Sequence, residues 1–133
     1  MSFRLFLKAS AIWALIAVAE TVHGIARRLT LEPIVGDLPA RRIAVFIGSA
    51  LVFAAAFIFV SWLKGSRPVH FLAVGVLWVV LTVCFEFGLG TLIGLSSERM
   101  FSDYDLANGG LLPIGLFLMF LSPIAAAKLR NEL

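Results

Sequence analysis

Three ionisable side chains stand at helical spacing in an otherwise apolar stretch near the start of the chain. Glu20, His23 and Arg27 belong to the sequence AETVHGIAR, residues 19–27. At about 100° per residue they fall within a narrow arc of one helix. Charged groups in an apolar helix are costly, and they usually face a bundle interior or an aqueous cavity. A carboxylate, an imidazole and a guanidinium on one such face could bind an ion, an anion or a proton.

A second carboxylate, Glu86, is the only acid in a later apolar segment, about residues 70–95. At about 1.5 Å per residue, Glu86 lies about 24 Å along the helix axis from the start of that segment. This places it a few residues outside the midplane, and Glu20 has a similar offset in its own segment. We therefore expect the two acids to meet at one depth, with His23 and Arg27 further outward.

The four side chains allow a functional and a structural interpretation. Two carboxylates in a medium of low dielectric constant would share one proton, and His23 and Arg27 could tune that proton or hold an anion. Alternatively, each acid simply pairs with an arginine and forms a fixed polar plug. We favour the functional interpretation for the assembled cluster. The predicted ligand or proton site is Glu20, His23, Arg27 and Glu86, and no catalytic residue is identified.

A metal site is a weaker alternative at the same position. Glu20 and His23 have the Glu-x-x-His spacing of di-iron helical bundles, which place both ligands on one helix face. A di-iron site needs a second copy of this motif, and the sequence has none. Glu86 could complete a mononuclear site, but the nearby Arg27 disfavours a cation. His23 and His70 stand at opposite ends of their segments and cannot share a haem, so no cofactor is predicted.

The elements that must position these residues are transmembrane helices. Of the 133 residues, 61% are hydrophobic and 14% are charged, whereas soluble domains have about 45–50% and about 25%. A bilayer core of about 30 Å needs about 20 apolar residues in a helix. Four segments qualify, and we predict an all-α integral membrane protein in one domain, 1–133. The predicted bundle of four transmembrane helices comprises about residues 5–26, 43–63, 70–95 and 111–128.

The ends of the predicted helices carry further signals. The first segment, with Ala17 and Ala19 in an A-x-A pattern, resembles a signal peptide, but we expect it to be kept as the first membrane helix. His70 is interpreted as a helix-start or interfacial residue. Gly90 and Gly94 form a GxxxG motif, for which close helix packing is the favoured role. Pro123 is expected to kink or end the last helix.

A charged network is predicted around the outer mouth of the bundle. The stretch from Ser96 to Leu106 is expected to form a short interfacial helix or loop between the third and fourth crossings. A serine N-cap would start this helix, and the Asn-Gly-Gly sequence at 108–110 would stop it. The residues expected to form the network are Arg28, Asp37, Arg41, Arg42, Glu98, Arg99, Asp103, Tyr104 and Asp105.

The distribution of basic residues gives the expected orientation. Four crossings put both termini on one side, and basic residues collect on the cytoplasmic side of membrane proteins. The terminal side has Arg4, Lys8, Lys64, Arg67, Lys128 and Arg130, and the other side has Arg27, Arg28, Arg41, Arg42 and Arg99. This excess, six against five, favours cytoplasmic termini in a bacterial-type inner membrane. Because the basic residues are spread over helix ends, no nucleic-acid partner is expected.

Three functions fit these features. The first is a small protein that binds or transports a small ligand, an ion or a proton at the outward-side polar site. The second is a non-catalytic accessory or assembly subunit of a larger membrane complex, in which the charged cluster is structural. The third is a membrane enzyme acting on a lipid or quinone-like substrate. It ranks last, because the one candidate nucleophile, Cys84, lies in an apolar run. The expected partners are the lipid bilayer and either further copies of the chain or another membrane protein.

Overall fold

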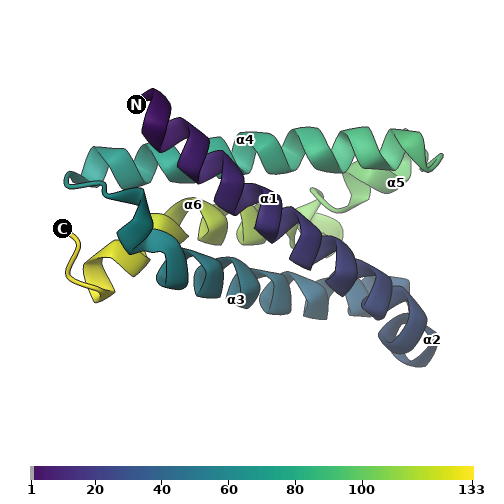
Figure 1. Cartoon of the computed structure of the whole chain (residues 1–133). Coiled ribbons are helices and arrows are strands. Elements are labelled where there is room, and N and C mark those ends of the chain that lie inside the picture. The colour runs from purple at the N-terminus through teal and green to yellow at the C-terminus, as the bar shows by residue number, and fades with distance from the viewer. Residues whose placement is uncertain (1) are drawn as a thin grey trace.

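The computed structural model describes residues 2–133, and every regular element in that range is helical. Four helical rods are long and apolar enough to cross a membrane: Phe3–Val35, Asp37–Leu63, Pro68–Leu92 and Leu112–Leu129. In Figure 1 the first rod crosses the others at a slant, and both ends of the chain lie at the same end of the bundle. The predicted all-helical class with four long apolar helices is thus confirmed.

The first rod is longer than the sequence predicts. It comprises α1 (Phe3–Ala26), the π-helical segment η1 (Arg27–Leu31) and α2 (Glu32–Val35). The Ser2 hydroxyl caps its start by accepting the backbone N–H of Leu5 at 3.1 Å, and Gly36, at a φ of 92°, ends it. The predicted segment, about residues 5–26, corresponds to α1, and no helical continuation beyond it was predicted. The chain instead widens into a π-helical turn there and continues.

The second and third rods are single helices, α3 (Asp37–Leu63) and α4 (Pro68–Leu92). Between them the chain turns through Lys64, which has a left-handed φ of 54°. Nδ1 of His70 then accepts the backbone N–H groups of Ser66 and Arg67, at 3.2 and 3.3 Å. These bonds cap the start of α4, which confirms the helix-start role predicted for His70.

The end of α4 corrects the interpretation of the GxxxG motif. Gly94 lies beyond the helix, at a φ of 83°, and the Leu95 N–H closes the turn on the Gly90 carbonyl at 2.8 Å. A Cβ added at Gly90 would lie 2.5 Å from the sulfur of Met100. Gly90 therefore makes room for a methionine of the following segment, and Gly94 serves as the left-handed residue that ends the helix.

The segment after α4 folds as α5 (Ser97–Ser102) and a short 3₁₀ turn, η2 (Leu106–Asn108). The Ser96 hydroxyl accepts the Arg99 N–H at 3.1 Å, as expected for the serine N-cap of the predicted short helix. The last rod, α6 (Leu112–Leu129), continues through Pro123. Of the two outcomes expected at this proline, a kink or a helix end, the structure excludes the helix end.

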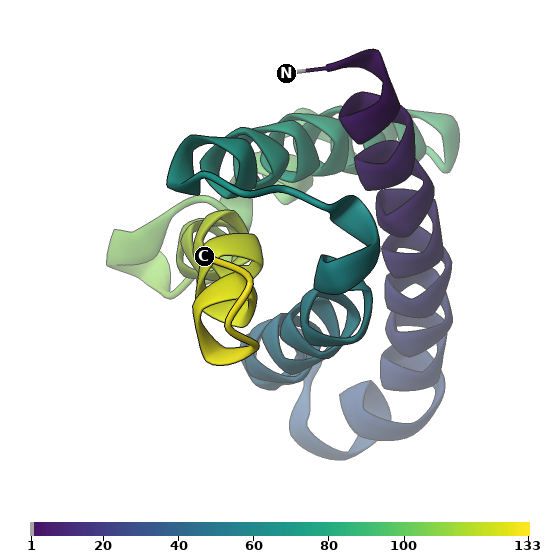
Figure 2. The same ribbon diagram turned by 60° about the vertical axis from the view of Figure 1, so that its left-hand side comes forward.

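The four rods form one bundle in which α6 lies between α3 and α4, and α1 packs across α3 and α4 on the other side. Figure 2 shows the rods arranged around a shared interior. Two of the rods approach closely at Gly75 of α4, where an added Cβ would lie 2.2 Å from the Phe120 carbonyl oxygen of α6. Only glycine at this position allows the two backbones to pack so closely.

Indole side chains tie α1 to α4 inside the bundle. Trp78 is fully buried and donates its Nε1–H to the Ala9 carbonyl at 3.0 Å. Trp13 donates to the Thr82 hydroxyl, also at 3.0 Å. Since a buried polar group left without a partner is costly, these bonds fix the relative depth of the two helices. The fully buried large side chains of the core are Trp78, Phe71, Ile12, Val60 and Val74, with Pro123.

The outer surface of the bundle is strongly apolar. Large side chains such as Val18 on α1, Ile58 on α3 and Phe117 on α6 are each at least 60% exposed. A protein in water would leave so much apolar area exposed only at a marked cost. The bundle therefore has the surface expected of helices that contact lipid, in agreement with the apolar composition of the chain.

Candidate polar site in the outer half of the bundle

The first rod carries the polar residues Glu20, His23 and Arg27, and no short contact joins their side chains. Glu20 and His23 are one helical turn apart on α1, and Arg27 follows where the π-helical segment η1 begins. Nδ1 of His23 lies 3.8 Å from Oε2 of Glu20, which is too far for a hydrogen bond. Helical spacing therefore brings these two side chains together without binding them to each other.

Glu20 is directed toward α3 and rests over a glycine. A Cβ added at Gly48 would lie 2.8 Å from Oε2 of Glu20, so the missing side chain creates the room for this carboxylate. The other oxygen, Oε1, is buried and accepts no hydrogen bond from any residue in 2–133. Gly48 is thus a site residue that the sequence analysis missed. Nothing in its apolar helix distinguishes it from a glycine used only for packing.

Arg27 stands at the point where the helix changes type. Its Nε is buried and has no hydrogen-bond partner within the described part of the chain, and its guanidinium forms none of the ion pairs found there. Single π-helical turns inside α-helices frequently occur at functional sites. The wider turn of Arg27–Leu31 has no signal in the sequence and was not predicted.

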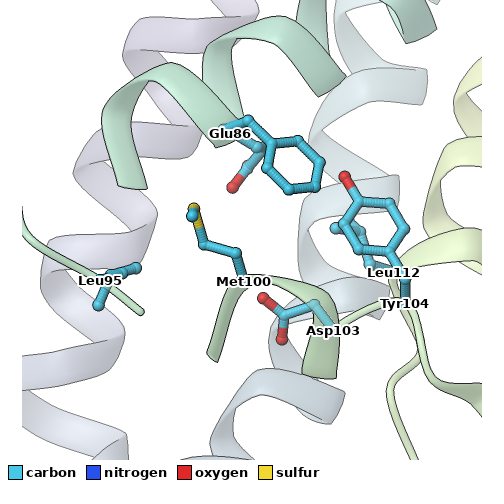
Figure 3. Close-up of a pocket in the computed structure, with 7 residues that line it drawn as sticks. Glu86, Leu95, Met100, Asp103, Tyr104 and Leu112 are labelled. Atoms are coloured by element: carbon cyan, nitrogen blue, oxygen red, sulfur yellow. The ribbon is translucent and has the colours of Figure 1, made fainter. Parts of the chain in front are cut away.

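Glu86 lines a small cavity between the end of α4, the segment around α5 and the start of α6 (Figure 3). The cavity has a volume of about 30 Å³, which admits one or two molecules of the size of water. The Glu86 side chain is accessible from outside the single chain, and within residues 2–133 it forms no ion pair. The residues lining the cavity are Glu86, Phe87, Leu95, Met100, Asp103, Tyr104 and Leu112.

Tyr104 closes one side of this cavity. Its ring stacks on Phe87 with the centroids 5.6 Å apart and an angle of 16° between the planes. Its hydroxyl is buried and has no partner among the described residues. Burial raises the pKa of Tyr104 above its usual value, and the negative charges of Glu86 and Asp103 raise it further. The phenol therefore stays protonated near neutral pH and presents a free O–H group beside Glu86.

At the edge of the cavity, which Asp103 lines, two arginines and two aspartates form a closed ring of ion pairs. Arg41 of α3 contacts Asp37 one turn earlier, at 3.0 Å, and also Asp103 just after α5. Arg99 contacts the same two acids, at 3.5 and 3.3 Å. Each arginine thus bridges both aspartates, and the ring fastens the segment after α4 to the start of α3. We refer to Asp37, Arg41, Arg99 and Asp103 as the ion-pair ring.

The other predicted members of the outer network are placed around this ring. Arg42 donates from Nε to the Gly109 carbonyl at 3.0 Å, and Asp105 accepts the Asn108 amide at 2.6 Å. Both bonds hold the loop before α6. Arg28 and Glu98 are exposed, and neither forms an ion pair within the described residues.

Neither of the two intramembrane acids forms an ion pair with an arginine within residues 2–133. Arg41 and Arg99 instead contact Asp37 and Asp103. Glu20 and Glu86 stand on α1 and α4, and the common depth expected for them from helical rise stays a prediction.

The geometry gives no support to a metal centre. Within residues 2–133, no group of three or more His, Cys, Asp or Glu side chains is arranged to hold a metal ion. Glu20, His23 and Glu86, the set considered from sequence, therefore do not converge as ligands would. What the arrangement offers chemically is two carboxylates, a phenol hydroxyl and a guanidinium with unused hydrogen-bonding capacity.

Comparisons with known proteins add no assignment, because no protein-family model, curated protein or solved structure matches the chain. The function has to be argued from the residues themselves.

Proposed function

We propose that the chain is an integral membrane protein that binds a small ligand, an ion or a proton at a polar site in the outer half of the bilayer. The site consists of Glu20, His23 and Arg27 on the first rod and Glu86 on α4. The membrane setting is supported by four rods of sufficient length and apolar character and by the large apolar side chains on their outer faces.

One observation carries the proposal: within residues 2–133 the two glutamates form no ion pair with an arginine. Arg41 and Arg99 are used by Asp37 and Asp103 in the ion-pair ring. A structural plug would satisfy its own charges, because an unpaired charge in an apolar medium is costly. The carboxylates of Glu20 and Glu86 are therefore free to bind a proton or to contact a ligand.

The neighbouring groups fit this role. Nδ1 of His23 lies 3.8 Å from Oε2 of Glu20, so a small movement of either side chain would allow them to exchange a proton, and Arg27 supplies positive charge at the outer edge of the site. Tyr104 offers a hydroxyl that can donate or accept a hydrogen bond beside Glu86. The ion-pair ring holds the outer segment in place over Glu86, so it shapes the site while its own charges remain neutralised.

We further propose that both termini are cytoplasmic, in an inner membrane of the bacterial type. The two termini lie at one end of the bundle (Figure 1), and the side with the termini has the slight excess of basic residues. The polar site would then open outward, beneath the ion-pair ring.

An accessory role in a larger complex is the second candidate, and one surface favours it. Large apolar side chains near the outer end of α4 and on the segment that follows are more than half exposed: Leu92, Ile93, Phe101 and Leu106. A partner membrane protein, or another copy of the chain, could cover them. In that case the ion-pair ring would fix the docking segment, and the glutamates would be incidental to function.

The proposed function is tested with purified protein in liposomes that contain a pH-sensitive dye, and in lipid nanodiscs for thermal unfolding. We expect proton movement, or a rise in unfolding temperature with an added small cation, that Glu20→Gln and Glu86→Gln each reduce about tenfold. Glu98→Gln is the matched control, because Glu98 is an exposed acid that forms no ion pair among the residues described. If both measurements are indifferent to Glu20 and Glu86, the proposal is wrong.

A further inference from the structure

A second cavity, wider and purely apolar, lies between α4 and α6. This groove has a volume of about 240 Å³ and is lined by Val76, Val79, Val80, Leu116, Phe117 and Phe120. Its volume is below the range of about 300–1,000 Å³ that is usual for pockets holding drug-sized molecules. A single slim alkyl chain suits it better than a ring system or a two-chain lipid.

The groove leads toward the cavity at Glu86. On α4, Val80 of the groove and Phe87 of the cavity are seven residues apart, so they lie on the same helix face about 10.5 Å apart along the axis. On α6, Leu116 of the groove is one turn from Leu112 of the cavity. Both hollows therefore belong to one α4–α6 interface, with the apolar part deeper and the polar part further out.

The chemistry of the outer part favours a cationic group. Glu86 offers a carboxylate that no residue of the described chain pairs with, and the stacked rings of Phe87 and Tyr104 line the same cavity. Aromatic faces and carboxylates both attract an ammonium group. The volume of about 30 Å³ admits a group of the size of water, and a protonated primary amine is of that size.

The ion pairs around Glu86 show which carboxylates are already neutralised. Asp103, which lines the same cavity, contacts both Arg41 and Arg99, and Asp37 contacts the same two arginines. Glu86 forms no ion pair with any residue in 2–133. A cationic group in the cavity would therefore meet one carboxylate that no arginine neutralises.

We propose that the groove and the cavity together bind a single-chain amphiphile with a protonated primary amine as its head. The alkyl chain lies in the groove between α4 and α6, and the ammonium group contacts Glu86 beneath Tyr104. This inference rests on the proposed function, because it names the ligand class of the same site. It adds a groove that the sequence analysis did not consider.

The test compares ligands that share a chain and differ in the head. The protein is placed in phosphatidylcholine nanodiscs, whose lipids have no primary amine, and binding of dodecylamine, dodecanol, dodecanoate and propylamine is measured. We expect dodecylamine to bind about tenfold or more tightly than the other three. Adding phosphatidylethanolamine, a two-chain lipid with an amine head, should not displace it, because the groove admits one chain.

Two substitutions separate the parts of the site. Glu86→Gln should remove the preference for the amine over the alcohol, while the chain still binds. Val80→Trp should fill the groove and weaken dodecylamine about tenfold. The control is Val18→Trp, on the lipid-facing side of α1, which should leave binding unchanged. Both positions are more than half exposed, so neither substitution overfills the core.

The outcomes distinguish this inference from the proposed function. Equal binding of amine, alcohol and carboxylate, or no effect of Val80→Trp, would show that the amphiphile inference is wrong. If the liposome and unfolding responses still depend on Glu20 and Glu86, the proposed function survives that result. If these responses are also unaffected by both glutamates, the two proposals fail together.

Discussion

The carboxylate of Glu20 on α1 lies directly over Gly48 on α3, where an added Cβ would be 2.8 Å from Oε2. A helix with a side chain at this position would push the acid out of its place. The glycine therefore sets both the distance between α1 and α3 and the direction in which Glu20 points.

Gly48→Ala should destabilise the folded protein by about 1–3 kcal/mol, because the new methyl group must displace the Glu20 carboxylate. The measurement is the free energy of unfolding in nanodiscs, together with the response of the site to a proton or a small cation. Gly88→Ala is the control, since a Cβ there meets no atom within 4 Å. A loss in Gly48→Ala no larger than that in Gly88→Ala would contradict the close contact.

Gly75→Ala should be more damaging than Gly48→Ala. The added Cβ would lie 2.2 Å from the backbone carbonyl oxygen of Phe120, and a backbone carbonyl cannot rotate away as a carboxylate can. We expect a loss of about 3 kcal/mol in the free energy of unfolding. Normal stability of this variant would show that α4 and α6 are further apart than described.

The ion-pair ring should show energetic coupling between its members. Arg41 and Asp103 are partly buried and in contact, so a double-mutant cycle with Arg41→Ala and Asp103→Ala should give about 1–3 kcal/mol of coupling in the free energy of unfolding. Arg28→Ala, at an exposed arginine without an ion pair, should change stability by no more than about 0.5 kcal/mol. A coupling near zero would mean that the ring does not hold the outer segment.

Tyr104 is the only tyrosine in the chain, so its titration can be followed by ultraviolet absorbance of the phenolate. Burial and the charges of Glu86 and Asp103 raise its pKa above 10.0, and the midpoint should lie above that of free tyrosine. Glu86→Gln should move the midpoint back toward 10.0, because one of the two negative charges is removed. A midpoint unaffected by Glu86→Gln would place Tyr104 away from Glu86.

The same shift predicts how stability depends on pH. A tyrosine whose pKa is higher in the folded than in the unfolded state is a weaker acid when folded, so unfolding releases a proton at high pH. The free energy of unfolding should therefore fall as the pH rises above 10.0, and Tyr104→Phe should reduce this fall. An unchanged slope in Tyr104→Phe would contradict the shift.

The sequence predicted the four long helices well, because the length of an apolar segment is enough to identify a helix that can cross a membrane. The four apolar segments, the serine cap at Ser96 and the role of His70 all appear in the structure. Two local features were not foreseen. The π-helical turn begins at Arg27 and extends the first rod, and α6 continues through Pro123, where a kink or a helix end was expected. Packing of α6 against α3 and α4 explains why this helix continues.

Of the candidate site, the sequence predicts the depth of the two acids but not the ion pairs around them. Helical rise alone predicts that Glu20 and Glu86 lie at one level, and this stays a prediction. Which acids pair with the arginines depends on the fold of the segment around α5, which brings Asp103 to Arg41. These two residues are 62 positions apart, so no local sequence pattern predicts their contact. For the same reason the contact of Glu20 with Gly48 could not be foreseen.

The most direct test of the proposed site is an experimental structure in lipid at a resolution that shows ligands and water. The account predicts non-protein density against Glu86, between Tyr104 and the α4–α6 groove, with Arg41 and Arg99 still on the two aspartates. The contradicting result would be Arg27 in ion pairs with both Glu20 and Glu86 and no density beside them. The cluster would then be a fixed polar plug.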